Sequence, residues 1–312
     1  MSGIRMHFKH TIHFITNRCE QEQFLLLPST RVNQLIGAWF ARSLALFGQG
    51  LEIYAFIFLG NHFHLLCKDT EGRLAQFMGY FQGNLARAIN QELGRHGKFF
   101  AREYDDAILD GDEAFLNRYA YILCNAVKAG LVEKATDWPG WSSLDGALSD
   151  GKYRFELLNA TQYYKAMRFG KPTNASDYIE TWEFEMATPP MWQHLSKEER
   201  TKQIQTLVSD AEEKYRLQRE GQPVLGVEAI QRQQPTDRPQ NPARKPRIKF
   251  ICFNQKRLCE LLEGYREFAR GYRNALNIFY KSFASNKKAN VEWPHGSYPP
   301  SYIRPMDYPL AA

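Results

Sequence analysis

The sequence predicts an α+β fold: a two-layer core, with an antiparallel sheet covered by helices on one face, followed by a mainly helical C-terminal extension. Within the first 150 residues, segments that alternate like strands are separated by segments with helical periodicity. Beyond Trp141, helical spacing and a Pro- and Gln-rich stretch replace the strands. The 312 residues are 44% hydrophobic and 14% aromatic, which is enough apolar surface for a packed core.

The N-terminal elements follow from periodicity and from turn signals. Pro28-Ser29-Thr30 opens a helical pattern that Phe47-Gly48 closes, and Gly60-Asn61 separates two apolar runs as a hairpin turn would. We therefore expect a strand at 6–16, a helix at 30–47, a central strand at 51–59, its hairpin partner at 62–67, a helix at 74–93, an extended segment at 97–109, and a helix at 113–128 with Asp112 as N-cap and Gly130 at its end. This order suits a ferredoxin-like sheet.

The C-terminal half divides by composition. Helical patterns are expected at 155–169 and at 197–219, so 151–220 is predicted to be a helical extension. Residues 221–249 are predicted to be a basic linker because they are rich in Pro and Gln. The remainder, 250–312, is expected to hold one helix, at about 254–283, and an irregular Pro- and Tyr-rich tail.

Charge and cysteine usage narrow the class of protein. A net charge of +6 and a pI near 8.9 favour polyanionic partners without proving one. The five cysteines are scattered and form no C-x-x-C pair, which favours a reducing compartment over a disulfide framework. The sequence shows neither a signal-peptide pattern nor a stretch approaching the ~20 apolar residues of a membrane span. We expect a soluble, cytoplasmic protein.

A histidine pair stands at the start of the second hairpin strand. Side chains two residues apart in a strand share a face, so His62 and His64 leave the sheet together while Phe63 and Leu65 point into the core. Two imidazoles on one face make half of a site for a divalent metal ion. The competing interpretation is a pair of ordinary strand histidines, which an H-x-H pattern alone does not exclude.

The helix expected at 113–128 carries two tyrosines with different surroundings. Its apolar row comprises Phe115, Tyr119, Ile122 and Ala126, and a second, polar row comprises Arg118, Tyr121, Asn125 and Lys128. On a functional interpretation, Tyr121 is a phenol nucleophile that attacks a phosphodiester. Asn125 then offers a third metal ligand, and Lys128 or Arg118 contacts phosphate. The alternative is an amphipathic helix with a solvated polar face.

Together these segments resemble one family. Residues 54–66 (YAFIFLGNHFHLL) look like the histidine–hydrophobic–histidine hairpin of one-tyrosine HUH transposases. Residues 121–130 (YILCNAVKAG) look like the tyrosine helix of the REP-associated members. Trp138 and Trp141-Ser142-Ser143 follow where such proteins commonly have a Trp- and Ser-containing segment, and the resemblance covers about residues 6–150.

The resemblance implies an HUH endonuclease fold over residues 1–150 and a complete catalytic site. Tyr121 would be the nucleophile, His62 and His64 the metal ligands, and Asn125 the third ligand, with Mg²⁺ or Mn²⁺ as the cofactor. Such a transposase, at once an endonuclease and a strand transferase, cuts single-stranded DNA near hairpins and rejoins it through a 5′-phosphotyrosine. The family includes monomers and helix-swapped homodimers, and the protein would associate with the nucleoid when bound to DNA.

Basic residues outside this helix are candidates for DNA contacts. Single-strand binders combine basic grooves with aromatic platforms. We name Arg18, Arg87, Arg95 and Lys98 for a surface that follows the strand, and Arg244, Lys245 and Arg247 for a flexible basic arm, beside Arg118 and Lys128 on the tyrosine helix. For each of them a solvated surface charge is the competing interpretation.

Two functions from other classes remain open. A metal-dependent phosphodiesterase with a water nucleophile would use the same ligands, and its cleavage would survive Tyr121→Phe. A protein that binds hairpin DNA without cutting it would show salt-dependent binding and no cleavage.

Overall fold

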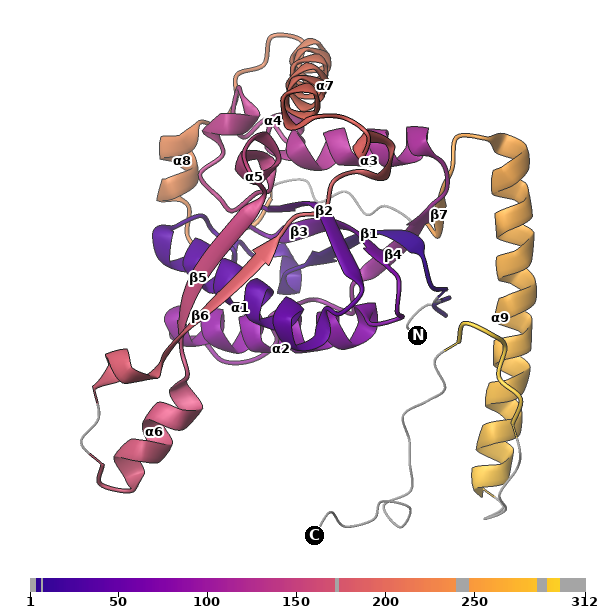
Figure 1. Ribbon diagram of the computed structural model, residues 1–312, viewed down its shortest axis with the longest axis horizontal. Helices are drawn as coiled ribbons and strands as arrows, with labels where there is room; N and C mark the ends of the chain where they lie inside the picture. Colours follow the sequence, from indigo (N-terminus) through magenta and orange to yellow (C-terminus); the bar gives the residue numbers. More distant parts are fainter. Residues whose placement is uncertain (1–3, 7, 172–173, 240–246, 285–290, 298–312) are drawn as a thin grey trace. The chain divides into compact units, whose positions relative to one another are not determined.

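A five-stranded sheet forms the centre of the structure, a computed structural model that describes residues 4–6, 8–171, 174–239, 247–284 and 291–297. Its strand order is β2-β3-β1-β4-β7. All neighbouring strands are antiparallel except β4 and β7, which are parallel. The strands are β1 (Thr11–Arg18), β2 (Leu51–Phe58), β3 (His62–Asp69), β4 (Asp105–Leu109) and β7 (Phe250–Ile251) (Figure 1).

The two faces of the sheet carry separate apolar cores. One face, which includes Phe63 and Leu65, packs on α1 (Thr30–Phe47) and α2 (Leu74–Glu92). The other face packs under α3 (Asp112–Leu123) and α4 (Asn125–Lys128), and α7 (Lys197–Gln218) packs on these two helices. The predicted α+β class and the order of the first four strands and two helices are confirmed. Helices cover both faces, however, because α3 and α4 pack on the side opposite to α1 and α2.

Strand β2 was expected to be a central strand because it is apolar on both faces. It lies instead at one end of the strand order. Its outer edge is covered by chain from beyond the tyrosine helix. Phe58 N donates to Trp141 O (2.9 Å), and Ala187 N donates to Ile53 O (2.8 Å). A strand with helices on both faces and loops along its edge has the hydrophobic run of a central strand.

The expected helix at 113–128 is broken in two. Its N-cap is Gly111 rather than Asp112, and α3 ends at Cys124, whose φ of −107° and ψ of 19° depart from helical values. The short α4 then begins at Asn125. Gly130, with φ of 66°, follows α4 in the left-handed conformation that glycine adopts readily.

Residues 151–220 contain a β-hairpin that the helical prediction missed. Strands β5 (Lys152–Leu158) and β6 (Ile179–Glu185) pair antiparallel along their whole length. Tyr153, Phe155 and Phe184 pack against the α1–α2 core. In Lys152–Leu158 the apolar residues alternate with charged ones, which is the pattern of a strand. The expectation of a helix over 155–158 was therefore wrong.

The remaining elements between Lys9 and Phe253 are short, apart from one long helix. α7 (Lys197–Gln218) matches the prediction and begins with a capping box between Ser196 and Glu199. The others are α5 (Leu144–Leu148), α6 (Ala160–Arg168), α8 (Val227–Arg232) and the 3₁₀ turns η1 (Glu20–Glu22), η2 (Ala135–Asp137), η3 (Ala175–Tyr178) and η4 (Pro190–Trp192). The predicted linker thus contains a helix, and its neighbour β7 joins the sheet.

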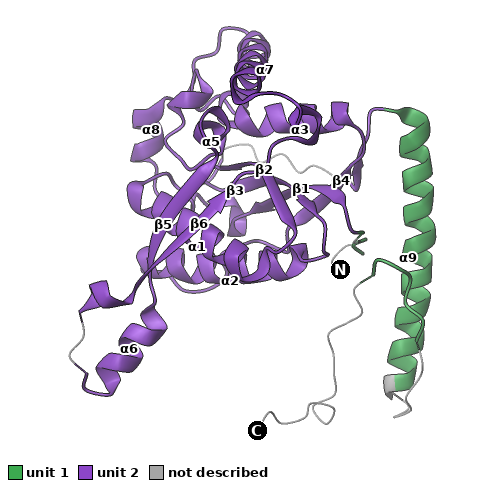
Figure 2. Ribbon diagram, in the orientation of Figure 1, with its two compact units in different colours: residues 1–8, 254–312 green, residues 9–253 purple. Residues whose placement is uncertain are grey.

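The chain forms two compact units (Figure 2): unit 1 consists of the two termini, Met1–Phe8 with Asn254–Ala312, and unit 2 is Lys9–Phe253. The sheet and all elements up to β7 belong to unit 2. In unit 1, α9 (Gln255–Ala284) confirms the predicted C-terminal helix, and the Tyr265 hydroxyl donates to Ile4 O (2.9 Å). No helix among the described residues is long and apolar enough to cross a membrane.

Candidate nucleophile and metal site

Strand β3 presents both histidines to the face that α3 covers. His62 and His64 lie on the same side, with ring centroids 5.0 Å apart. In the neighbouring strand β1, Arg18 is the register partner of His62, and Thr16 is the partner of His64. The expected geometry of the pair is therefore present, with a cation directly beside it.

Helix α3 places Tyr121 over this pair. The Tyr121 hydroxyl lies 3.4 Å from His64 Nε2. Phe14 of β1 stacks on the His64 ring (5.1 Å between centroids) and meets the Tyr121 ring edge-on (5.9 Å). Sequence reasoning separated Tyr121 from the buried Tyr119 correctly but missed Phe14. The signal was present, since Phe14 is two residues from Thr16 and so shares its face of β1.

The break at Cys124 gives Asn125 a place beside Tyr121. Asn125 is buried, and its side chain hydrogen-bonds to the Tyr121 oxygen. As the first residue of α4, it lies directly after the break at Cys124. Its amide group is thus fixed next to the phenol.

Three predicted cations surround the tyrosine. The Lys128 ammonium lies 4.3 Å from the centroid of the Tyr121 ring, and the Arg118 guanidinium carbon lies 5.4 Å from it. Arg118 is half-buried, and within the described part of the chain its enclosed Nε has no hydrogen-bond partner. Arg18 forms an ion pair with Glu22 (3.6 Å). Cations placed in this way favour a negative charge on the phenol or on a phosphate beside it.

Burial dominates the electrostatics of the site. Burial lowers the pKa of His62 to about 3, with a further contribution from Arg18. Burial also holds the pKa of His64 well below its ordinary value, and the charges of His62 and Arg18 act in the same direction. Burial raises the pKa of Tyr121, while the hydrogen bond from Asn125 and the charge of Arg118 oppose that rise. Both imidazoles are therefore neutral near pH 7.

Neutral imidazoles are the form that binds metal ions. The Nδ1 atom of His62 lies 2.6 Å from Asn61 Oδ1, an orienting contact that leaves Nε2 for a ligand. His64 directs Nε2 toward Tyr121, and its buried Nδ1 has no hydrogen-bond partner among the residues that the structure describes. The part of the chain that the structure describes contains no group of three His, Cys, Asp or Glu side chains suited to a metal ion. Two imidazoles with the Asn125 amide as a third group fit a divalent cation.

The other predicted DNA-contacting residues are not part of this cluster. Arg87 lies on α2, which packs on the opposite face of the sheet, and bonds to Gly83 O and Asn84. Arg95 bonds to Asn90 (2.7 Å), and Lys98 pairs with Glu20 (3.4 Å). Arg247 pairs with Asp105 (2.7 Å) at the β4 strand. Arg244 and Lys245 lie outside the described residues.

An apolar cavity of about 230 Å³ adjoins His62 and Arg18. Its walls include Leu59, Trp138 and Ile230. The cavity was not predicted, because the segments that line it are far apart in the sequence.

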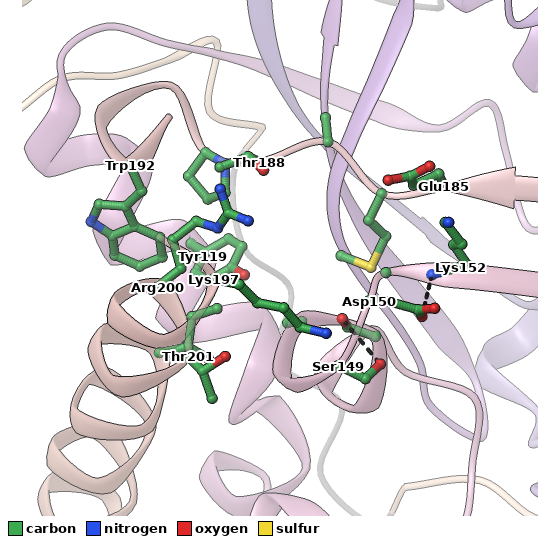
Figure 3. A pocket seen from close by; sticks show the side chains of 17 residues that line it. Tyr119, Ser149, Asp150, Lys152, Glu185, Thr188, Trp192, Lys197, Arg200 and Thr201 are labelled. Carbon is green, nitrogen blue, oxygen red and sulfur yellow. Dashed lines mark hydrogen bonds between the residues drawn. The ribbon is translucent and has the colours of Figure 1, made fainter. Parts of the chain in front are cut away.

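A second cavity, of about 270 Å³, is mostly polar and lies where α7 begins (Figure 3). The buried Tyr119 lines it, together with Trp192, Lys197 and Arg200. Tyr119 and Tyr121 thus belong to different surroundings on the same helix.

The chain is similar to two solved transposase structures. One is a REP-associated tyrosine transposase bound to a REP hairpin, with 17% identity over 47% of this chain and 85% of that chain and a TM-score of 0.40. The other is a protein designated a transposase in Deinococcus radiodurans R1, with 16% identity over 39% of this chain and 95% of that chain and a TM-score of 0.28. No family model and no curated protein matches the chain.

Proposed function

We propose that the protein is a transposase that cuts single-stranded DNA beside hairpins and rejoins it, with Tyr121 as the nucleophile. The observation that carries this proposal is the contact between the Tyr121 hydroxyl and His64 Nε2 (3.4 Å) within a cluster of cations. A nucleophile, a pair of metal-binding imidazoles and phosphate-binding cations meet there from one strand and one broken helix. The motif resemblance supports the same assignment independently of this geometry.

The proposed reaction conserves the phosphodiester. The Tyr121 oxygen forms a bond to phosphorus, the bond from phosphorus to the 3′-oxygen breaks, and the departing 3′-oxygen takes up a proton. The phenol loses its own proton as it attacks. The 5′-phosphotyrosine keeps the energy of the bond, so a free 3′-hydroxyl can reverse the step without ATP.

The chain's own groups meet the needs of this step. Asn125 donates a hydrogen bond that favours the charged form of Tyr121, and Arg118 adds positive charge against the effect of burial. Arg18, beside His62, and Lys128, beside Tyr121, would contact the phosphates that adjoin the scissile bond. A divalent cation, Mg²⁺ or Mn²⁺, would bind His62, His64 and Asn125 and would stabilise charge on the oxygens of the scissile phosphate.

The experiment that tests this proposal is a search for a covalent adduct. The protein is incubated with hairpin-bearing single-stranded oligonucleotides from the flanks of its own gene, with Mg²⁺ or Mn²⁺, and run on a denaturing gel. We expect an adduct that disappears in Tyr121→Phe, in His64→Ala and with a chelator. Tyr119→Phe is the matched control, because it removes one hydroxyl from the same helix outside the cluster, and it should keep the adduct.

Two outcomes would replace the proposal. Cleavage without an adduct that persists in Tyr121→Phe would identify a phosphodiesterase with a water nucleophile. Salt-dependent binding with neither cleavage nor adduct, across several hairpins, would identify a DNA-binding protein.

A further inference from the structure

The apolar cavity beside His62 continues the line of the candidate site along β3. Tyr121 contacts His64, His62 follows two residues nearer to the β2–β3 turn, and that turn, Leu59 to His62, forms one wall of the cavity. The four features therefore run in the order Tyr121, His64, His62 and cavity. A scissile phosphate placed at the cation that the two imidazoles would bind has the nucleophile on one side and the cavity on the other.

The cavity has the size and lining of a pocket for one base. Its volume of about 230 Å³ is below the roughly 300–1,000 Å³ of pockets for drug-sized ligands. Phe24 and Trp138 offer aromatic surface. The indole N–H of Trp138 donates to Phe58 O (3.2 Å), so the ring contributes only apolar surface to the cavity. Aromatic side chains in such pockets stack on unpaired bases.

One wall comes from the segment that composition predicted to be a linker. We call residues 225–239 the strap. Leu225 N donates to Gly130 O (2.8 Å), and Gly226 N donates to Leu131 O (2.9 Å). At its other end, the carbonyl of Asp237 accepts a hydrogen bond from Phe24 N (3.0 Å). These bonds fix the strap across the cavity between its two anchoring points.

The strap supplies a polar group to a wall that is otherwise apolar. Gln233 lines the cavity, and within the described residues its side-chain amide makes no hydrogen bond. Asn61, by contrast, is committed to His62 and to Glu22 O. An amide with donor and acceptor atoms can pair with the edge of a base, as adenine-reading Asn and Gln side chains do. Arg18 stands at the same cavity beside His62, where it can contact the adjoining phosphate.

We propose that this cavity binds the base of the nucleotide on the 5′ side of the scissile bond. This inference rests on the proposed function. In an in-line displacement the leaving oxygen departs opposite to the nucleophile. With Tyr121 on the His64 side, the leaving 3′-oxygen and its nucleotide lie on the His62 side, where the cavity opens.

This placement gives the cavity a task in rejoining. After cleavage the 5′ end is covalently bound to Tyr121, but the fragment with the 3′-hydroxyl is held only by non-covalent contacts. A terminal base in the cavity keeps that hydroxyl beside the phosphotyrosine. The cavity then sets both the base preference at the cut and the lifetime of the cleaved complex.

The test uses the full chain and a pool of hairpin-bearing single-stranded oligonucleotides with randomised flanks, with Mn²⁺. Cleaved 3′-hydroxyl ends are sequenced, and their release is followed under native conditions. We expect a base preference at the terminal nucleotide that Gln233→Ala relaxes. In Phe24→Ala the fragment should leave about tenfold faster, in keeping with the loss of one aromatic stack. Gln231→Ala, an exposed Gln on the same strap outside the cavity, should match the wild type.

A second measurement does not depend on cleavage. In the Tyr121→Phe variant the oligonucleotide stays uncut. With 5-iododeoxyuridine placed on the 5′ side of the scissile bond, it should photo-cross-link to Phe24 or Trp138. The base-pocket assignment would be overturned by cross-links that map elsewhere. It would also be overturned if neither Gln233→Ala nor Phe24→Ala changed the base preference at the terminal nucleotide. Either result would leave the tyrosine mechanism intact. If no oligonucleotide in the pool yields a Tyr121 adduct, the proposed function fails and this inference fails with it.

Discussion

Replacing Arg118 with Met removes one charge beside Tyr121 and keeps a long, mainly apolar side chain. The guanidinium carbon lies 5.4 Å from the Tyr121 ring. At that separation an effective dielectric of about 20 gives roughly 3 kcal/mol of attraction to a unit negative charge. Arg118 is only half-buried, so solvent screening reduces this to about 1–2 kcal/mol. Arg118→Met should therefore slow adduct formation by roughly 5- to 30-fold.

The assay is single-turnover adduct formation with saturating hairpin oligonucleotide, with the dissociation constant measured separately by fluorescence anisotropy. Arg87→Met is the matched control because Arg87 is exposed on α2, on the other face of the sheet. It should change the rate by less than twofold. A role for Arg118 in stabilising negative charge at Tyr121 is refuted if Arg118→Met also stays within twofold of the wild type, or if both variants lose activity equally.

The remaining predictions concern stability. Gly37→Ala, whose new Cβ would overlap the Phe155 ring, should lower the free energy of unfolding in urea by about 1–3 kcal/mol. Gly79→Ala meets nothing within 4 Å and should raise it by about 0.5–1 kcal/mol; similar values for both would contradict the close packing at Gly37. Asp69→Ala removes a buried carboxylate that accepts hydrogen bonds from the backbone N–H groups of Glu71, Gly72, Arg73 and Leu74, and should cost about 2–4 kcal/mol by the same measurement; a loss below 1 kcal/mol would refute the capping role. Burial lowers the pKa of His13, but the effect of the neighbouring Asp106 is opposite, and with it the net pKa is raised above the ordinary 6.5. The stability that this pair contributes is complete below pH 6.5 and is lost as the pH rises through the folded-state pKa, so urea midpoints should fall over that range in the wild type and not in His13→Gln.

The candidate site was predictable where short-range periodicity decides the direction of a side chain. The two-residue spacing placed His62 and His64 on one face of β3, and helical spacing separated Tyr121 from Tyr119. The break at Cys124 was not predictable, because the residues of 113–128 favour a continuous helix. Tertiary packing against α7 and the sheet outweighs that local preference.

The hairpin β5–β6 and the cavity were missed for different reasons. The alternation of charged and apolar residues around Phe155 does indicate a strand, but it covers only Lys152–Leu158 and leads directly into a helical pattern, with which it was merged. Gln233 belongs to a segment whose Pro and Gln content indicates a lack of periodicity but carries no information about contacts with distant residues. Trp138 was identified only as part of a motif, and its place in a cavity wall depends on residues about 100 positions further along the chain.

The packing of the hairpin β5–β6 on α1 has a consequence for synthesis on the ribosome. Phe184 is in contact with Phe40 and Phe56 (5.3 and 6.3 Å between centroids), so the aromatic surface of α1 is complete only after residue 184 has been made. At about 5–20 residues per second, the roughly 100 residues that separate α2 from Phe184 take about 5–20 s to translate. During that interval the nascent chain exposes the aromatic surface that Phe184 later covers, and transiently exposed apolar surface of this kind favours aggregation.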